Sequence, residues 1–370
     1  MNFSELLIND DLIALLNQKN ITQPTVVQSK VIPLVFNKKD VIVQAETGSG
    51  KTLCFVLPIA QLIKSSKHVQ VLVVAPTREL ALQVGAEFAF FANKLSTVVV
   101  YGGSSLDKQI KAVRRANIIV GTPGRLLDLI NRRVLDFSRI SFLVVDEVDE
   151  LLRMGFINDL EKIIARTPIQ RQSLMLSATI SDKVISLTNK FLFKPERVLV
   201  GKSKPLLEQY YYHVNHPDKI PLLVRIIKEQ AKGLTIVFCN TKGSTVYVTE
   251  LLKKNNINAD HLSSDLDQRS RERVLNRFIK GDLGVLVATD VAARGIHVDD
   301  VNLVINFDLP RSIDGYTHRV GRTARQGKPG ITISIICDRD YHQFRIINEQ
   351  GLIRKLVTGK INPIKLLKKV

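Results

Sequence analysis

Short runs of apolar, mostly β-branched residues alternate with longer stretches of helical pattern from one end of the sequence to the other. Runs such as Val71–Ala75 (VLVVA) and Phe142–Val145 (FLVV) contain no polar residue. Continuous apolar runs of this kind are typical of parallel strands, because helices cover a parallel sheet on both faces. The alternation therefore predicts an α/β fold, with mostly parallel sheets flanked by helices.

The predicted strands form two sets, which fits two domains in a chain of 370 residues. Val200–Leu206 (VGKSKPL) has the composition of a short linker. We therefore expect an N-terminal domain over residues 1–203 and a C-terminal domain over residues 204–370. The predicted strands are Val41–Gln44, Val69–Ala75, Thr97–Tyr101, Ile118–Gly121, Phe142–Val145 and Leu174–Ser177, then Gln209–Val214, Leu234–Cys239, Ala259–Leu262, Gly284–Ala288, Leu303–Asn306 and Thr332–Ile336.

Composition indicates a globular protein of a reducing compartment. Hydrophobic residues make up 45% and charged residues 24%, no apolar run has the length of a membrane span, and the first ten residues lack a signal-peptide pattern. The three cysteines, Cys54, Cys239 and Cys337, are far apart and lack CxxC spacing, which argues against a zinc ribbon or a disulfide framework. We expect an intracellular protein with no membrane partner, and the residues do not distinguish cytoplasm from nucleus.

The net charge of +18 is divided evenly along the chain. Residues 1–205 carry 27 Lys+Arg against 18 Asp+Glu, giving +9, and residues 206–370 carry 26 against 17, again +9. Basic residues that keep the surface soluble would explain the charge. A polyanion that touches both domains would explain its even division, so we expect nucleic acid as a partner.

The segment Ala45–Thr52 (AETGSGKT) has the spacing of a phosphate-binding P-loop between a strand and a helix. Gly48 and Gly50 allow backbone N–H groups to close around phosphates at a helix N-terminus. Lys51 would supply positive charge to the β- and γ-phosphates, and Thr52 a hydroxyl ligand for Mg²⁺. The alternative is a Gly/Ser turn that happens to end in Lys-Thr, and it leaves the flanking strand and helix unexplained.

Asp146 and Glu147 follow the predicted strand Phe142–Val145. Because ligands of open α/β sheets bind at the carboxyl ends of the strands, these acids should lie beside the P-loop. Asp146 is expected to hold Mg²⁺ and Glu147 to polarise the attacking water. Two adjacent acids are usually a solvated turn, but the apolar strand before them argues against that interpretation.

The segment His318–Arg325 (HRVGRTAR) places three arginines at positions i, i+3 and i+6 beside a histidine. The spacing predicts that Arg319, Arg322 and Arg325 share one helix face. A solvated basic helix or a phosphate-backbone contact would use the same residues. With a P-loop in the other domain, the arginines are also suited to act as arginine fingers.

Taken together, the chain resembles the DEAD-box family of ATP-dependent RNA helicases over about Phe3 to Ile336. The signature reads Asp146-Glu-Val-Asp149, and Val148 replaces the alanine of the family name, which we expect to change packing and not chemistry. The other matching segments, in order, are Phe3 with Pro24–Gln28 (PTVVQ), AETGSGKT, Pro76–Ala81 (PTRELA), Gly102-Gly103, Thr122–Arg125 (TPGR), Ser177–Thr179 (SAT), Val237–Thr241 (VFCNT), Gln268-x-x-Arg271, Ala288–Gly295 (ATDVAARG) and HRVGRTAR.

The resemblance implies two tandem RecA-like P-loop domains that form an RNA-stimulated ATPase. ATP and Mg²⁺ would be the cofactors, and the reaction would drive local unwinding of short RNA duplexes or remodelling of RNA–protein complexes. An ATP-gated RNA clamp with little unwinding, and a DNA-directed helicase of the same superfamily, are the alternatives. RNA would be held as a single strand or short duplex through its backbone, independent of sequence. The protein would be a monomer, with protein partners supplying specificity.

The resemblance also assigns roles to single residues. Gln28 would read the adenine edge, Arg322 and Arg325 would be arginine fingers, and His318 would link to the first domain. Ser177 and Thr179 would couple hydrolysis to strand separation through Asp149. The nucleotide contacts would be Gln28, Thr47, Gly48, Ser49, Gly50, Lys51, Thr52 and Gly295. The RNA contacts would be Thr77, Arg78, Gly102, Gly103, Thr122, Gly124 and Arg125 in the first domain and Gln268, Arg271 and Thr289 in the second.

Overall fold

The computed structural model describes residues 2–46, 48–200, 207–263, 265–293, 301–323, 329–349 and 355–356. The chain divides into two compact units, residues 1–202 and residues 203–370. Among the described residues, each unit contains one seven-stranded sheet in which all neighbouring strands pair in parallel. The predicted α/β architecture with two parallel sheets is confirmed.

The sheet of the first unit has the strand order β3-β4-β2-β5-β6-β1-β7. Its strands are β1 (Val41–Gln44), β2 (Val71–Val74), β3 (Thr97–Val100), β4 (Ile118–Gly121), β5 (Phe142–Val145), β6 (Gln172–Ser177) and β7 (Glu196–Leu199). Its helices are α1 (Asp10–Gln18), α2 (Val26–Phe36), α3 (Lys51–Leu62), α4 (Arg78–Phe91), α5 (Leu106–Val113), α6 (Pro123–Asn131), α7 (Val148–Arg153), α8 (Ile157–Ile164) and α9 (Asp182–Phe191).

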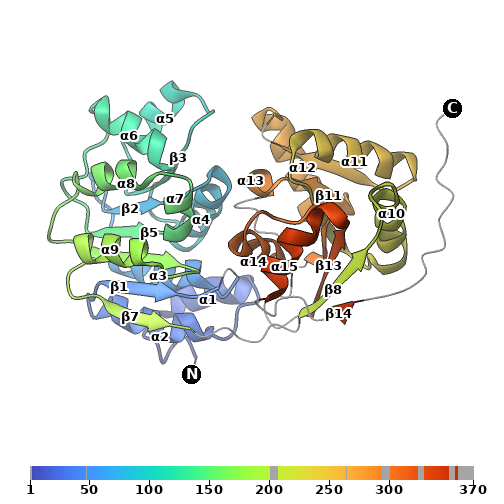
Figure 1. The fold of residues 1–370 in the computed structure, drawn as a ribbon. Helices are drawn as coiled ribbons and strands as arrows, with labels where there is room; N and C mark the ends of the chain where they lie inside the picture. The colour runs from blue at the N-terminus through green and yellow to red at the C-terminus, as the bar shows by residue number, and fades with distance from the viewer. Residues whose placement is uncertain are drawn as a thin grey trace. The chain divides into compact units, whose positions relative to one another are not determined.

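Helices cover both faces of this sheet, as Figure 1 shows. Side chains alternate across a strand, so Val41 and Val43 of β1 pack against α1 to α4 while Ile42 packs on the opposite face with α5 to α9. The apolar runs that predict the strands are therefore buried on both faces. Val148 lies fully buried in the second of these layers, so the substitution in the DEVD signature is accommodated in the core.

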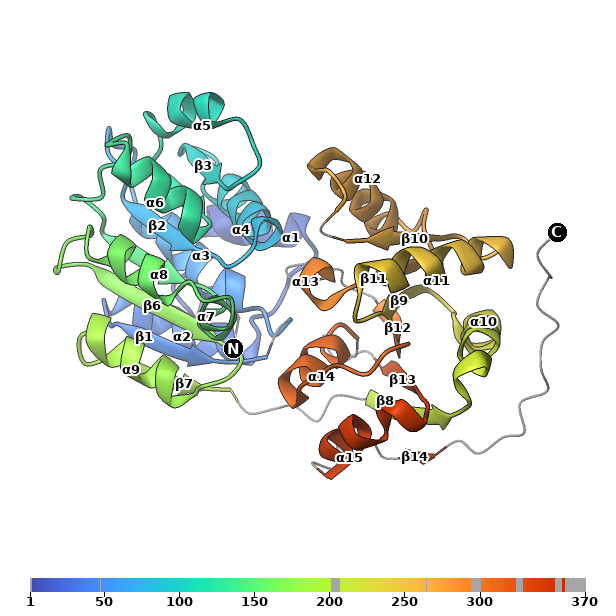
Figure 2. The ribbon, with the colours of Figure 1, turned by 45° about the horizontal axis from the view of Figure 1, so that its top comes forward.

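The sheet of the second unit has the strand order β10-β11-β9-β12-β13-β8-β14. Its strands are β8 (Leu207–His213), β9 (Leu234–Phe238), β10 (Ala259–Leu262), β11 (Val285–Ala288), β12 (Val301–Asn306), β13 (Gly330–Ile336) and β14 (Lys355–Leu356). Its helices are α10 (Lys219–Gln230), α11 (Lys242–Lys254), α12 (Gln268–Ile279), α13 (Asp290–Ala293), α14 (Ile313–Val320) and α15 (Tyr341–Glu349), with 3₁₀ turns η1 (His216–Asp218) and η2 (Asp338–Asp340). The turned view of Figure 2 shows the helices of this unit around its strands.

Polar residues before the helices explain where several of them begin. The side chains of Thr77, Asp267 and Ser312 accept hydrogen bonds from backbone N–H groups three residues further on, at the starts of α4, α12 and α14. Such N-caps satisfy donors that the first turn of a helix leaves open. Helices that begin at the carboxyl ends of strands thus have defined first turns, and the candidate sites lie there.

Two strands were not predicted, and both lie at sheet edges. β7 carries exposed Glu196 and Arg197, and β14 has only two residues. An edge strand can be short and charged because one of its sides has no partner strand, so it lacks the apolar run of a central strand. Across the described residues, no helix combines the length and apolar character needed to cross a membrane.

The packing of α4 on β3 yields a test of the fold. A Cβ atom added to Gly85 of α4 would lie 2.2 Å from Cγ2 of Val99 in β3. Gly→Ala inside a helix normally stabilises by ~1 kcal/mol, but here overpacking should destabilise the first unit by about 1–3 kcal/mol in urea unfolding. Gly243→Ala in α11 is the control, because no atom lies within 4 Å of the added Cβ.

The Gly85→Ala loss should be partly recovered by a second substitution, Val99→Ala, which removes the colliding methyl groups. A stability gain for Gly85→Ala comparable to that of Gly243→Ala would show that α4 does not approach β3 this closely.

Candidate nucleotide and nucleic-acid sites

Three neighbouring strands of the first unit end at the predicted nucleotide site. β5, β6 and β1 are adjacent in the sheet, with Val145 opposite Met175 and Gln44 opposite Ser177. The Ala45 N–H donates to the Ser177 carbonyl at 3.1 Å, which extends this pairing into the P-loop. The P-loop, the acidic pair and the Ser177–Thr179 segment therefore meet at one edge of the sheet.

The P-loop leads directly into α3, which begins at Lys51. Gly48 and Gly50 both have left-handed backbone angles, with φ of 83° and 87°. Lys51 is 7% exposed, and its Nζ donates to the Ala45 carbonyl at 2.7 Å. The Ser49 hydroxyl donates to the Glu46 carbonyl at 2.7 Å. The loop is thus folded back on itself, with a buried ammonium group at the start of a helix.

Gln28 ties the start of α2 to the P-loop. Its Oε1 accepts from the Thr25 N–H at 2.9 Å, and its Nε2 donates to the Gly50 carbonyl at 3.1 Å. Thr25 and Gln28 form a capping box, a role that the T-x-x-Q spacing could have indicated. In this structure the Gln28 amide therefore positions the loop, while adenine recognition by Gln28 stays a prediction.

The acidic pair follows β5. The pKa of Asp146 is raised to about 7, mainly by burial and next by the neighbouring Glu147 carboxylate, while the Lys51 ammonium opposes both effects. Glu147 has left-handed backbone angles (φ 48°, ψ 55°) at the start of α7, and its N–H donates to Asp146 Oδ1 at 2.9 Å. A left-handed backbone in a residue with a side chain is strained and is common at functional sites.

This donor set fits a magnesium nucleotide. Lys51 is a buried cation at a helix N-terminus, which suits phosphate oxygens. Asp146 is a buried carboxylate that resists ionisation in the protein alone, and a divalent cation would supply the positive charge that its surroundings lack. Thr52, the second residue of α3, carries the hydroxyl expected to share that cation.

The predicted contact between Thr179 and Asp149 is present. Asp149 Oδ2 accepts from both the backbone N–H and the hydroxyl of Thr179, at 2.9 Å each. The Ser177 hydroxyl does not reach Asp149 and donates to the Thr179 carbonyl at 2.6 Å. The end of β6 is therefore connected to α7, directly after the acidic pair.

Several predicted RNA residues of the first unit gather around the loop Tyr101–Ser104 after β3. A Cβ on Gly103 would lie 2.7 Å from Nη1 of Arg78, so the guanidinium of α4 packs against this glycine. Arg125 of α6 donates from Nη1 and Nη2 to the Ser104 carbonyl, at 3.4 Å each. Two arginines from different helices thus converge on one loop.

The other predicted RNA residues of this unit lie at nearby strand ends. Thr77 and Thr122 are the N-cap residues of α4 and α6, which follow the neighbouring strands β2 and β4. A Cβ on Gly102 or on Gly124 would meet no atom within 4 Å. The first-unit set therefore occupies one edge of the sheet, with open space at two of its glycines.

In the second unit, two predicted RNA residues meet at α13. Arg271 of α12 donates from Nη2 to the Ala292 carbonyl at 2.9 Å, and Thr289 accepts from the Ala292 N–H at 3.4 Å. Gln268 begins α12. Thr47, Gly295 and Arg325 lie outside the described residues.

The prediction that the three arginines of HRVGRTAR share one helix face is wrong. α14 ends at Val320 with Gly321 as its C-cap, so His318 and Arg319 lie in the last helical turn and Arg322 lies beyond it. The end of the helix therefore lies between Arg319 and Arg322, and only the first of them is helical.

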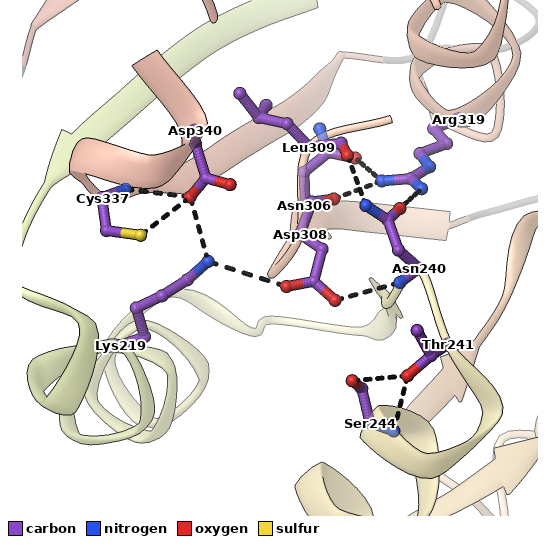
Figure 3. Close-up of polar contacts among 10 residues, drawn as sticks. All are labelled: Lys219, Asn240, Thr241, Ser244, Asn306, Asp308, Leu309, Arg319, Cys337 and Asp340. Carbon is purple, nitrogen blue, oxygen red and sulfur yellow. Dashed lines mark hydrogen bonds and ion pairs between the residues drawn. The ribbon is translucent and has the colours of Figure 1, made fainter. Parts of the chain in front are cut away.

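Arg319 is buried inside the second unit, with 1% of its surface exposed. It donates to Asp290 from Nε and Nη2, at 2.5 and 2.9 Å. It also donates to Asn240 Oδ1 at 2.8 Å, to Asn306 Oδ1 at 3.2 Å and to the Asp308 carbonyl at 2.5 Å (Figure 3). A solvated basic helix is thereby excluded for this arginine. Sequence reasoning missed its role, because the partners lie in distant segments.

The Arg319 contacts continue to Lys219, the buried first residue of α10. Lys219 Nζ lies 3.7 Å from Asp308 Oδ1 and 3.4 Å from Asp340 Oδ2, and Asp308 Oδ2 accepts from the Asn240 N–H at 3.0 Å (Figure 3). The ends of β9 and β12, the start of α10 and η2 are thus joined in one polar network that holds the end of α14.

Comparison with known proteins finds related helicases along most of the chain. Residues 25–187 match the DEAD/DEAH box helicase family, and residues 218–327 match the helicase conserved C-terminal domain. The chain is 42% identical over 366 residues to DEAD-box ATP-dependent RNA helicase CshA of Streptococcus pneumoniae, covering 97% of this chain and 70% of the relative. It is 39% identical over 365 residues to a probable ATP-dependent RNA helicase of Methanocaldococcus jannaschii, covering 97% and 99%. The solved structure of S. cerevisiae Dbp5 bound to RNA and ADP BeF3 has a TM-score of 0.87 at 28% identity, covering 96% and 94%.

The raised pKa of Asp146 predicts that this carboxylate destabilises the protein when no ligand is bound. Its folded pKa of about 7 lies above the ordinary aspartate value of 3.8, so stability falls as the pH rises from about 4 to 7 and levels off above that. At 1.36 kcal/mol per pKa unit, Asp146→Asn should stabilise the first unit by up to ~4 kcal/mol at pH 8.

The Asp146→Asn gain should shrink to less than half at pH 5, where the wild-type carboxyl is largely protonated. Denaturant unfolding in EDTA without nucleotide measures both values. If Asp146→Asn raised the free energy of unfolding equally at pH 5 and pH 8, or lowered it at pH 8, the raised pKa of Asp146 would be contradicted.

Proposed function

Because the chain belongs to the DEAD-box family of ATP-dependent RNA helicases, we propose that it is an RNA-stimulated ATPase built on two RecA-like units. ATP hydrolysis would drive local unwinding of short RNA duplexes or remodelling of RNA–protein complexes. The observation that supports this most directly is the meeting of Lys51, Asp146 and the Thr179–Asp149 contact at the ends of β1, β5 and β6.

In this proposal the first unit binds Mg²⁺-ATP. Bound ATP would supply the transferable phosphoryl group, and Mg²⁺ would neutralise charge on its oxygens. Lys51 and the backbone of Gly48–Gly50 would hold the phosphates, while Asp146 and Thr52 would hold the cation. Glu147, fixed by its left-handed backbone beside Asp146, would orient the attacking water and accept its proton.

The second unit would supply the arginine fingers Arg322 and Arg325. Arg319 cannot fill that role in this structure, because its N–H groups are already engaged with Asp290, Asn240, Asn306 and Asp308. It would act by fixing the end of α14, which Arg322 follows in the chain. Arg322 would then stabilise negative charge that develops on the transferred phosphoryl group.

RNA would be held by its backbone at the loop Tyr101–Ser104 of the first unit and around α13 of the second. The groups gathered there are arginines, hydroxyls and glycine backbone, which suit phosphates and 2′-hydroxyls and do not read bases. The even +9/+9 division of charge and the RNA bound to Dbp5 in its solved structure support RNA contact with both units.

Replacing the water-orienting carboxylate should separate binding from catalysis. Glu147→Gln should retain ATP and RNA binding and lower the RNA-stimulated kcat by about 10²–10⁴-fold, because the amide cannot accept the proton. Steady-state phosphate release measures kcat, and anisotropy of labelled RNA measures binding. Glu161→Gln, a surface residue of α8 paired with Lys190, is the control and should be neutral.

A strand-displacement assay then separates helicase from clamp. The wild-type chain should release the short strand only with hydrolysable ATP, and RNA should stimulate hydrolysis more than DNA. RNA-stimulated hydrolysis without strand release would favour the clamp. Turnover by Glu147→Gln near the wild-type rate would refute the role of this residue.

The finger assignment has its own test. Arg322→Ala should lower RNA-stimulated kcat by about 10³–10⁵-fold, because a finger acts on transition-state charge, while nucleotide binding by the first unit persists. Arg339→Ala, at an exposed position in η2 of the same unit, is the matched control and should keep kcat within twofold. If both variants hydrolyse ATP equally fast, Arg322 is not a finger.

A further inference from the structure

Gln109 of α5 contacts the loop Tyr101–Ser104 and belongs to none of the helicase motifs. α5 packs beside β3, as Figure 2 shows, and the Gln109 side chain is 6% exposed. Its Nε2 donates to the Tyr101 carbonyl at 3.1 Å. This bond requires the nitrogen on the loop side, so the orientation of the amide is fixed.

The other end of this amide is unsatisfied. Gln109 Oε1 is buried and has no hydrogen-bond partner among the described residues. A buried acceptor without a partner is costly, so a leucine of similar volume would serve the core as well or better. The Nε2 bond to the loop is therefore the interaction that a glutamine makes here and an apolar side chain cannot.

That bond sets the plane of one peptide group. The Tyr101–Gly102 peptide is trans, so its N–H points opposite to the carbonyl that Gln109 holds. The Gly102 N–H is thereby aimed away from α5. No described residue accepts a hydrogen bond from it, and a Cβ on Gly102 would meet no atom within 4 Å.

The rest of the loop is held in a compatible way. Arg125 donates to the Ser104 carbonyl, which fixes the loop at its other end. Gly103 has a φ of 83°, and an added Cβ would collide with the Arg78 guanidinium. The loop therefore presents an open N–H donor at Gly102, and the guanidinium groups of Arg78 and Arg125 contact the next two residues of the loop. An N–H donor beside two positive charges suits a phosphate oxygen.

We propose that Gln109 is a positioning residue for RNA binding, which orients the Gly102 N–H toward a backbone phosphate by holding the Tyr101 carbonyl. The inference rests on the proposed RNA site. Gln109 does not touch RNA itself, and it acts through the peptide plane. Loss of its amide should weaken RNA binding without lowering the stability of the fold.

The chain offers a matched control in Gln172, at the start of β6. Gln172 is also buried, at 8% exposed. Its Nε2 donates to the Lys39 carbonyl at 2.6 Å and to the Val35 carbonyl at 3.2 Å, and its Oε1 has no partner within the part of the chain that the structure describes. It lies at the amino end of its strand, whereas the loop Tyr101–Ser104 lies at a carboxyl end of the same sheet. Gln172→Leu thus removes a buried amide donor at the amino ends of the strands, the sheet edge opposite to the loop Tyr101–Ser104.

The experiment compares Gln109→Leu, Gln109→Met and Gln172→Leu in the full chain. Kd for labelled single-stranded poly(U) is measured by anisotropy with a non-hydrolysable ATP analogue, alongside the RNA KM and kcat of the ATPase and the thermal midpoint. Both Gln109 variants should raise Kd and RNA KM about tenfold, because that is the effect of losing one hydrogen bond to a charged group. Their thermal midpoint should stay at the wild-type value. Gln172→Leu should change Kd less than twofold. Two apolar replacements of different shape guard against one that fails to fold.

RNA affinity unchanged in both Gln109 variants would overturn the inference. An equal loss of RNA affinity in Gln172→Leu would also overturn it, and so would a loss that appears only together with a lower thermal midpoint. A purely structural role of Gln109 would produce either of these results. Failure of the wild-type chain to bind poly(U) would instead overturn the proposed RNA site, and this inference with it.

Discussion

Parallel strand pairing is the constraint on which both sites depend. It directs the carboxyl ends of all strands in a sheet to one edge, so residues far apart in sequence come together there. In the first unit the ends of β1, β5 and β6 carry the P-loop, the acidic pair and the Ser177–Thr179 segment. In the second unit the ends of β9, β11 and β12 carry Asn240, Asp290 and Asp308, the partners of Arg319.

Arg319 of the second unit and Asp146 of the first are both buried ionisable groups, but their surroundings differ in charge compensation. In the second unit the donors of the Arg319 guanidinium are engaged by side chains and carbonyls around it, so the charge is compensated within the protein. In the first unit burial and the neighbouring Glu147 carboxylate outweigh the Lys51 ammonium, which is why the pKa of Asp146 is raised. A fully compensated charge fixes a helix end, whereas an uncompensated one favours a ligand that brings the missing charge.

Local sequence pattern was enough for the core strands and for the P-loop, because continuous apolar runs and the GSGKT spacing are properties of neighbouring residues. It was not enough for the edge strands β7 and β14, which lack such runs. Nor could spacing separate Arg319 from Arg322, since the helix ends between them and the Arg319 partners lie up to 79 residues away. Gln109 and Gln172 each bury an amide whose Nε2 donates to backbone carbonyls, and only the structure places one beside a loop at the carboxyl ends of the strands and the other at the amino end of β6.

The position of β1 in its sheet also affects how the chain is made. Val41 pairs with Leu174 on one side and Glu196 on the other, so both partner strands are synthesised at least 133 residues later. At about 5–20 residues per second this delay is on the order of ten seconds. Throughout that interval the apolar strand Val41–Gln44 has neither of its neighbours. The first unit therefore completes its sheet only after residue 199 has left the ribosome, and until then both edges of β1 lack the strands that pair with them.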